Sequence, residues 1–171
     1  MHRRSTVSKK RPAPLAPVPS VAPFMDLVAA DEKELTNLLG DARLARRLIK
    51  LQARMPQASL PELIAYDWLE KYQIQFLYQG EYGGGRQVRG GQVPDFVINW
   101  GGKGLVWRVQ GDYWHTKPGA RENDIVGKMQ LMGSWVNGLQ VRNIVDVWES
   151  QLYKRYDFVL TMAMAGIEVG K

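Results

Sequence analysis

Apolar positions recur at helical spacing from residue 31 onward. Asp31 and Glu34 form a capping box, in which two side chains satisfy backbone N–H groups of the first helical turn. The spacing predicts one amphipathic helix from there to about Arg54, with apolar positions at Leu35, Leu38, Leu39, Ala42, Leu48 and Ile49. Its polar face carries four cations that either face solvent or follow a phosphate backbone: Arg43, Arg46, Arg47 and Lys50.

A second helix is predicted from Ser59 to about Tyr72. Ser59 and Glu62 form another capping box, and Pro61 falls in the first turn, where its missing N–H removes no helical hydrogen bond. The expected buried face consists of Leu63, Ile64, Trp68 and Leu69.

Three β-rich runs follow this helix. The first is Ile74–Tyr78, and the others are Val93–Trp100 and Leu105–Gly111. Three of the four residues 101–104 between the last two runs are glycines, so we expect an antiparallel hairpin there.

The rest of the chain predicts a helix, a strand and a closing helix, over Asn123–Val136, Val141–Trp148 and Glu149–Ala165 respectively. The order helix, three strands, helix, strand, helix predicts an α/β fold in which a mixed β-sheet is flanked by helices.

Residues 1–23 differ in composition from everything that follows. Prolines alternate with small residues there, which favours an extended, disordered arm rather than a helix. Five of the six net positive charges of the chain lie in this arm, at Arg3, Arg4, Lys9, Lys10 and Arg11. Such an arm either tethers the protein to nucleic acid, binds another protein, or serves for solubility or targeting. We therefore divide the chain into the arm, an N-terminal helical segment over 24–58 and an α/β domain over 59–171.

The composition removes several classes of chemistry. The chain has no cysteine, which excludes disulfides, thiolate metal sites and a cysteine nucleophile. No apolar run approaches the roughly 20 residues of a membrane span, so we expect no membrane partner and a cytoplasmic location.

The hairpin carries the best candidates for chemistry. Hydrolysis of a phosphodiester at neutral pH calls for a hard divalent cation such as Mg²⁺, which takes oxygen ligands, and Asp95 is the first candidate. Arg108 and Gln110 share one face of the next strand, and the register of the hairpin can bring that face beside Asp95. Arginine cannot ligate a metal, so the candidate metal ligands are Asp95, the backbone carbonyl of Val109, the side-chain carbonyl of Gln110, and Asp112.

Two segments, PDFVI at 94–98 and LVWRVQGDYWH at 105–115, resemble the PD-(D/E)XK nucleases. The GDYWH ending is similar to that of the very-short-patch repair endonucleases, and the similarity extends over about residues 59–152. The resemblance implies a restriction-endonuclease-like core and a DNA endonuclease that uses Mg²⁺ or Mn²⁺. This chain departs from the family pattern at Arg108 and Gln110, where an acidic ligand and a lysine are usual.

The resemblance also implies individual roles. His115 becomes the general base, which suits its ordinary pKa of about 6.5, although a hydrogen-bonded loop histidine is the plainer interpretation. Tyr113 and Trp114 become residues that enter the DNA between bases. Lys128 becomes a phosphate contact, although with Asp124 it also fits an ordinary helical ion pair.

Two further groups of residues have competing interpretations. Glu62 is explained by its capping box, and a catalytic role near the metal is the alternative that the family suggests. Arg86 and Arg89, in the glycine-rich segment 83–91, either contact a nucleic-acid backbone or belong to a simple connector.

Two hypotheses about function follow. In the first, the chain is a metal-dependent endonuclease with Asp95 and Gln110 in the metal site and His115 as base. In the second, it is a nuclease-fold protein without cleavage activity that binds nucleic acid or serves a larger assembly, and Arg108 forms an ion pair with Asp95 in place of a metal.

Overall fold

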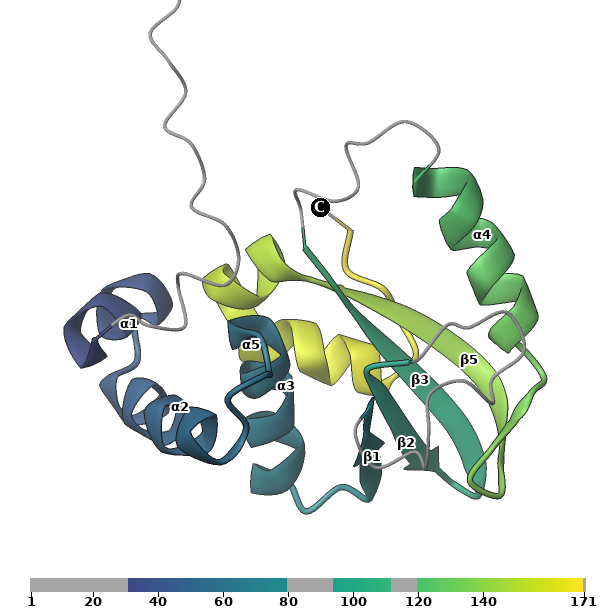
Figure 1. Ribbon diagram of the computed structural model, residues 1–171, viewed down its shortest axis with the longest axis horizontal. Coiled ribbons are helices and arrows are strands. Elements are labelled where there is room, and N and C mark those ends of the chain that lie inside the picture. The colour runs from purple at the N-terminus through teal and green to yellow at the C-terminus, as the bar shows by residue number, and fades with distance from the viewer. Residues whose placement is uncertain (1–30, 80–93, 112–119, 171) are drawn as a thin grey trace, which may run out of the picture.

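The fold is described from a computed structural model, which covers residues 31–79, 94–111 and 120–170, with backbone alone over 120–124. It is a mixed α/β fold in which a curled five-stranded sheet packs between helices (Figure 1). The division at residues 23 and 24 lies outside the described part.

The first predicted helix is two helices, and the single-helix prediction was wrong. α1 spans Glu32–Leu39 and α2 spans Ala42–Arg54. Gly40 ends α1 in the left-handed conformation (φ 68°), which glycine adopts without a steric penalty. Asp41 then caps α2 by accepting hydrogen bonds from the backbone N–H groups of Arg43 and Leu44, at 2.9 and 3.0 Å.

The cations of α2 are largely part of its solvated face. Arg46 pairs with Glu32 at 2.7 Å, and Arg47 donates two hydrogen bonds to Asp67 at 2.8 and 3.0 Å. The first pair joins α2 to α1, and the second joins α2 to α3 with its arginine exposed; ion pairs open to solvent contribute little stability each.

α3 spans Leu60–Lys71 and begins as its sequence predicted. The carboxylate of Glu62 accepts hydrogen bonds from both the backbone N–H and the hydroxyl of Ser59, at 2.7 and 2.6 Å, which confirms the capping box. All four residues expected on its buried face are buried.

The strand order of the sheet is β1-β2-β3-β5-β4. β1 (Phe76–Tyr78), β2 (Phe96–Trp100) and β3 (Lys103–Gln110) are successive antiparallel strands. The pairing of β2 with β3 confirms the hairpin that the glycine-rich turn predicted. β5 (Leu139–Trp148) runs parallel to β3, with Arg108 level with Asp146 and Gln110 level with Trp148. This parallel pair is the centre of the sheet.

The predicted helix over 123–136 ends early. α4 spans Ala120–Leu131, and Trp135–Val136 forms β4, which pairs antiparallel with the start of β5. Asn137 and Gly138 make the turn between them with φ values of 44° and 78°. An Asn-Gly pair is a strong hairpin signal, and it outweighed the helical period of the apolar residues before it.

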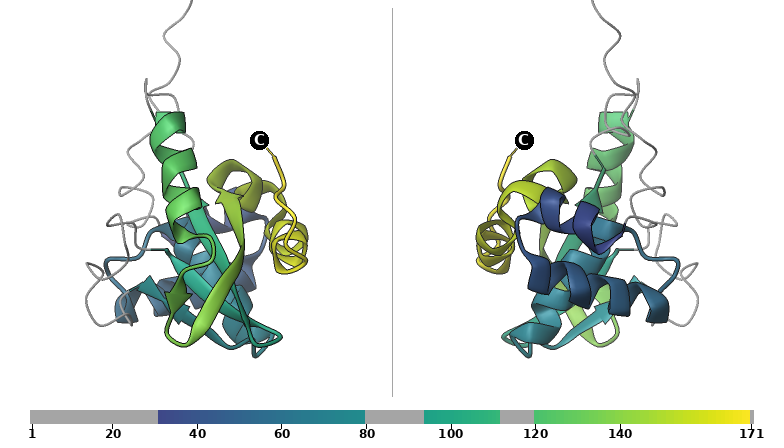
Figure 2. Two further views of the ribbon diagram at one scale, coloured as in Figure 1. Left: turned by 90° about the vertical axis from the view of Figure 1, so that its right-hand side faces the viewer. Right: turned by 90° about the vertical axis from the view of Figure 1, so that its left-hand side faces the viewer.

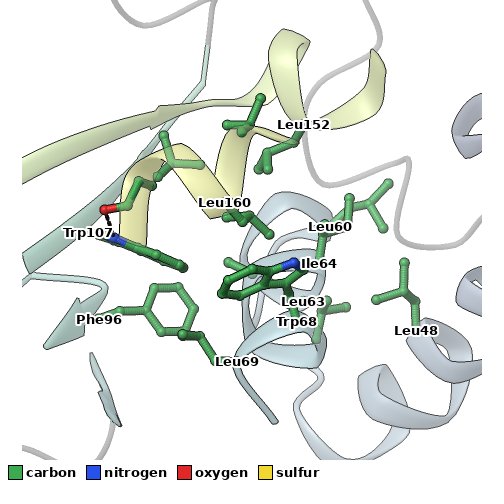
Figure 3. Packing of buried hydrophobic residues seen from close by; sticks show 14 of the residues in the cluster. Leu48, Leu60, Leu63, Ile64, Trp68, Leu69, Phe96, Trp107, Leu152 and Leu160 are labelled. Carbon is green, nitrogen blue, oxygen red and sulfur yellow. Dashed lines mark hydrogen bonds between the residues drawn. The ribbon is translucent and has the colours of Figure 1, made fainter. Parts of the chain in front are cut away.

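Helices cover the two faces of the sheet unequally (Figure 2). The larger core joins α1, α2, α3 and α5 (Glu149–Met164) to one face of the sheet, where Trp107 is fully buried and donates a hydrogen bond to the carbonyl of Ala163 at 3.2 Å (Figure 3). The opposite face carries a small cluster of Val97, Val106, Leu131, Val136, Val141 and Ile144, over which α4 lies.

No helix within residues 31–79, 94–111 and 120–170 is long and apolar enough to cross a membrane.

Candidate functional site

Charged and polar side chains gather at one end of the sheet, where β2 begins and where β3 and β5 end. They form two groups. The first, which we call the acidic pair, consists of Glu62 and Asp95. The second, which we call the Asp146 network, joins Asp146 to Arg108, Lys128 and Gln110.

The acidic pair is held by backbone and amide groups. One carboxylate oxygen of Asp95 accepts a hydrogen bond from the backbone N–H of Val109 at 2.7 Å, across the β2–β3 hairpin. Gln79 connects the two acids, because its backbone N–H donates to the carbonyl of Asp95 at 2.9 Å and its side-chain amide donates to Glu62 at 2.5 Å. Capping box and hairpin therefore fix the two carboxyl groups near each other.

Burial of Asp95 and the nearby charge of Glu62 raise the pKa of Asp95 to about 7. The hydrogen bond from Val109 and the charge of Arg108 act in the opposite direction and are outweighed. The same environment, with burial as the largest cause, raises the pKa of Tyr78 above its ordinary value. Burial and the neighbouring carboxylate thus both disfavour the ionised form of Asp95, and a bound cation would favour it.

The Asp146 network is built across the parallel strands. Arg108 donates a hydrogen bond to Asp146 through Nε at 2.8 Å, its Nη2 lies 2.7 Å from the same oxygen as an ion pair, and both side chains are buried. Lys128 reaches the other oxygen of Asp146 from α4, at 2.5 Å. One buried carboxylate therefore pairs with two cations from two different elements, and these ion pairs offset part of the desolvation cost of the buried charges.

The network extends to the end of the chain. The side-chain amide of Gln110 donates to Asp146 at 3.3 Å. Glu168, beyond α5, lies 3.5 Å from Lys128 and accepts a hydrogen bond from the indole N–H of Trp148 at 3.1 Å. The residues after α5 are thereby attached to the same end of the sheet.

The structure brings together only part of the set predicted from the sequence. Glu62, Asp95 and Val109 meet, so Glu62 both caps α3 and lies beside Asp95. The amide nitrogen of Gln110 is engaged with Asp146 instead. The anion that Arg108 binds through Nε and Nη2 is Asp146, whereas the sequence suggested Asp95 as its partner. Arg86, Arg89, Asp112, Tyr113, Trp114 and His115 lie outside the described residues, as does the side chain of Asp124.

Sequence reasoning missed Asp146, Gln79 and Glu168. Asp146 did leave a signal, because it is the single acidic residue in the otherwise apolar segment 144–148. A carboxylate in such a strand needs a buried cation, and Arg108 is one. Gln79 and Glu168 left no comparable pattern.

The acidic pair offers the kind of ligand that Mg²⁺ takes. Mg²⁺ is commonly bound by one or two protein carboxylates and completes its octahedron with water and phosphate oxygens, which two adjacent acids allow. Within the described residues, no group of three or more His, Asp or Glu side chains is placed to hold a metal. A third carboxylate ligand would have to come from outside the described residues, and Asp112 follows β3 by two positions.

Comparison of the chain with protein-family models, with curated proteins and with solved structures finds no match in any of the three. Function must therefore be inferred from the residues of this site.

Proposed function

We propose that this chain is a metal-dependent endonuclease that acts on DNA phosphodiester bonds and has a restriction-endonuclease-like core. The observation that supports the proposal best is the buried acidic pair, Glu62 and Asp95, fixed at the start of β2 beside the backbone of β3. Two carboxylates kept close at a cost in electrostatic repulsion suit a cation better than they suit an empty core.

In this proposal Asp95 and Glu62 bind Mg²⁺ or Mn²⁺, which polarises the phosphate and lowers the pKa of an attacking water. The carbonyl groups of Val109 and Gln110 and the carboxylate of Asp112 are the further candidate ligands. His115 takes the proton of the water, a role that its ordinary pKa of about 6.5 allows at neutral pH.

DNA contacts are assigned by chemistry. Lys128 is placed at the same end of the sheet as the acidic pair, and its ammonium group is suited to a phosphate oxygen. Arg86 and Arg89 supply cations for the backbone, and Tyr113 and Trp114 supply rings that stack on or between bases.

One observation favours the second function, a nuclease-fold protein that binds nucleic acid without cutting it. Arg108 and Lys128 both pair with Asp146, so each of these two cations already has an anionic partner within the protein. A network of this kind serves stability and leaves less positive charge for a transition state.

Nicking of supercoiled DNA in Mg²⁺ or Mn²⁺ separates the two functions. The endonuclease proposal expects metal-dependent nicking by the wild-type chain and its loss in Asp95→Ala. Asp67→Ala is the matched control, because Asp67 is another largely buried aspartate whose partner, Arg47, lies away from the site. DNA binding without nicking in both metals would leave the binding function.

A further inference from the structure

Glu168 lies between two hydrogen-bond donors that come from different elements. The indole N–H of Trp148, at the end of β5, donates to one of its carboxylate oxygens at 3.1 Å, and the ammonium group of Lys128, on α4, lies 3.5 Å from the other. Trp148 is level with Gln110, so both donors lie at the end of the sheet where β3 also ends. Figure 1 shows the segment after α5, in yellow, running toward this end. The two donors form what we call the anion subsite, and a carboxylate of the chain itself occupies it.

The segment after α5 is held in place by contacts other than the carboxylate of Glu168. The backbone N–H of Ile167 donates to a carbonyl in the last turn of α5 at 3.0 Å, and the side-chain amide of Asn143 donates to the carbonyl of Gly166 at 3.0 Å. Val169 packs against the larger core. The side chain of Glu168 can therefore turn away from the anion subsite while the backbone around it stays in place.

Lys128 does not depend on Glu168 for its position. Its ammonium group lies 2.5 Å from Asp146, whose side chain is 2% exposed and also pairs with Arg108. The contact with Glu168 is longer and more open, because the side chains of Lys128 and Glu168 are 31% and 38% exposed, and such ion pairs contribute little stability. Arg108 and Lys128 supply two positive charges and Asp146 one negative charge, so without Glu168 these three carry a net charge of +1. That charge matches one phosphodiester group.

We infer that the anion subsite binds a phosphate group of the substrate, and that Glu168 occupies the subsite until the phosphate displaces it. The identification of that substrate as DNA rests on the proposed function, but the inference does not require cleavage. A phosphate oxygen accepts hydrogen bonds from an ammonium group and from an indole N–H, as a carboxylate does. Trp148 is thus a second phosphate contact beside Lys128, and Glu168 competes with the substrate and lowers its affinity.

The donors and their place in the sheet favour a phosphate over other ligands. A metal ion is excluded, because neither an ammonium group nor an indole N–H has a lone pair to offer. Asp95 directly precedes β2, and β2 and β5 lie on either side of β3. Neighbouring strands are about 4.8 Å apart, so the strands that carry the acidic pair and the subsite are roughly 10 Å apart. At a rise of about 3.4 Å per nucleotide, one DNA strand spans that separation with about three nucleotides.

Binding of a short DNA duplex by the full chain in EDTA tests the competition without cleavage. Glu168→Gln keeps the shape of the side chain and removes its charge, so it should tighten binding about 3-fold or more and steepen the salt dependence by up to ~0.9 units of log K per log unit of salt. Glu70→Gln, at an exposed position near the end of α3, is the matched control for the change in net charge and should do less. The gain should vanish in a Lys128→Gln background and shrink in a Trp148→Phe background, which keeps the ion pair of Lys128 with Asp146. A gain no larger than that of Glu70→Gln, or one that both backgrounds leave unchanged, overturns the inference.

A second measurement separates the subsite from the proposed function. Inorganic phosphate is the probe, and the readout is the indole N–H resonance of Trp148 in a proton–nitrogen correlation spectrum, assigned by its loss in Trp148→Phe. Phosphate should shift this resonance at a several-fold lower concentration in Glu168→Gln than in the wild type, whereas chloride at equal ionic strength should not. A phosphate shift in a chain that binds no DNA would support the subsite and contradict the nucleic-acid function. DNA binding by a chain in which phosphate never moves the resonance, even in Glu168→Gln, would leave the function standing and overturn the inference.

Discussion

Asp95 is the residue whose protonation the fold changes most clearly. Its pKa is raised to about 7 from an ordinary value of 3.8, so between pH 4 and pH 7 the folded protein binds a proton that the unfolded chain releases. The contribution of Asp95 to folding stability therefore falls as pH rises through that window, by up to ~1.4 kcal/mol per pH unit.

The first prediction tests this sign. Asp95→Asn keeps an oxygen that can accept the Val109 hydrogen bond but cannot ionise. The free energy of unfolding of the variant and of the wild type is measured by urea titration at pH 5 and pH 8. The difference, variant minus wild type, should be larger at pH 8 than at pH 5. A wild-type stability that increases from pH 5 to pH 8 by more than that of the variant would contradict the charge arrangement proposed for the acidic pair.

The second prediction concerns the metal. If Asp95 and Glu62 bind Mg²⁺, millimolar Mg²⁺ should raise the melting temperature at pH 8. The free energy of unfolding should increase by ~2.7 kcal/mol when the Mg²⁺ concentration is a hundred times the dissociation constant. The gain should shrink at pH 5.5, where Asp95 is protonated and the metal must displace the proton. Asp95→Asn should abolish it, and EDTA should reverse it in the wild type. An equal gain in wild type and variant would place the metal elsewhere.

The third prediction belongs to Asp146. Asp146→Ala leaves the buried guanidinium of Arg108 without this carboxylate and should cost ~3–5 kcal/mol of stability in chemical denaturation. The more exposed pair Arg47–Asp67 is the comparison, and Asp67→Ala should cost ~1 kcal/mol or less. The double variant Asp146→Leu with Arg108→Met should recover much of the loss, because it removes both charges together. Equal costs for the two aspartates would mean that the network is not a buried one.

At the scale of elements, local signals fixed most of the fold. The N-cap at Asp31, the capping box at Ser59 and the glycine turn of the β2–β3 hairpin lie within a few residues of what they determine, so they were predictable. The division of α1 from α2 and the ending of α4 before β4 were not anticipated, although Gly40 and Asn137-Gly138 carried the signal. The apolar period continued past Gly40 in the first case and up to the Asn-Gly turn in the second, and turn chemistry prevailed in both.

The site was predictable only in part for a related reason. The Asp95–Val109 contact follows from hairpin register, which the turn between the two strands fixes. The partner of Arg108 is set by the parallel pairing of β3 with β5. Arg108 and Asp146 lie 38 positions apart in the sequence. A parallel pair needs a crossover connection, and no local pattern fixes its register.

That parallel pairing yields the fourth prediction. A Cβ at Gly104 would lie 3.2 Å from the Cα of Val141 and 3.3 Å from backbone atoms of Gln140, where β3 meets β5. Gly104→Ala should therefore destabilise the protein by ~1–3 kcal/mol, because backbone atoms must shift. Gly170→Ala, which meets nothing within 4 Å, is the control and should leave the melting temperature unchanged. A stabilised Gly104→Ala would show that the strands are not packed this closely.

At the scale of the whole molecule, the distribution of charge matters more than its sum. Residues 1–23 contain five of the six net positive charges. In the domain, Arg46, Arg47 and Arg108 each form an ion pair with a carboxylate, so these cations add little net charge. If the chain binds DNA, the N-terminal segment should therefore supply much of the salt-dependent affinity, and the domain should supply the site.

The fifth prediction separates these contributions. Deletion of residues 1–23 should leave the melting temperature within a degree of the wild type, because the sequence shows no apolar period there that would link them to the core. It should also flatten the dependence of DNA affinity on salt, by up to ~0.9 units of log K per log unit of salt for each phosphate that the protein no longer neutralises. A full-length variant with Arg3, Arg4, Lys9, Lys10 and Arg11 changed to Gln should reproduce the flatter slope, whereas Pro12→Ala with Pro14→Ala should not. A slope that the deletion leaves unchanged would rule out the tether, and a melting temperature several degrees lower would show that these residues pack on the domain.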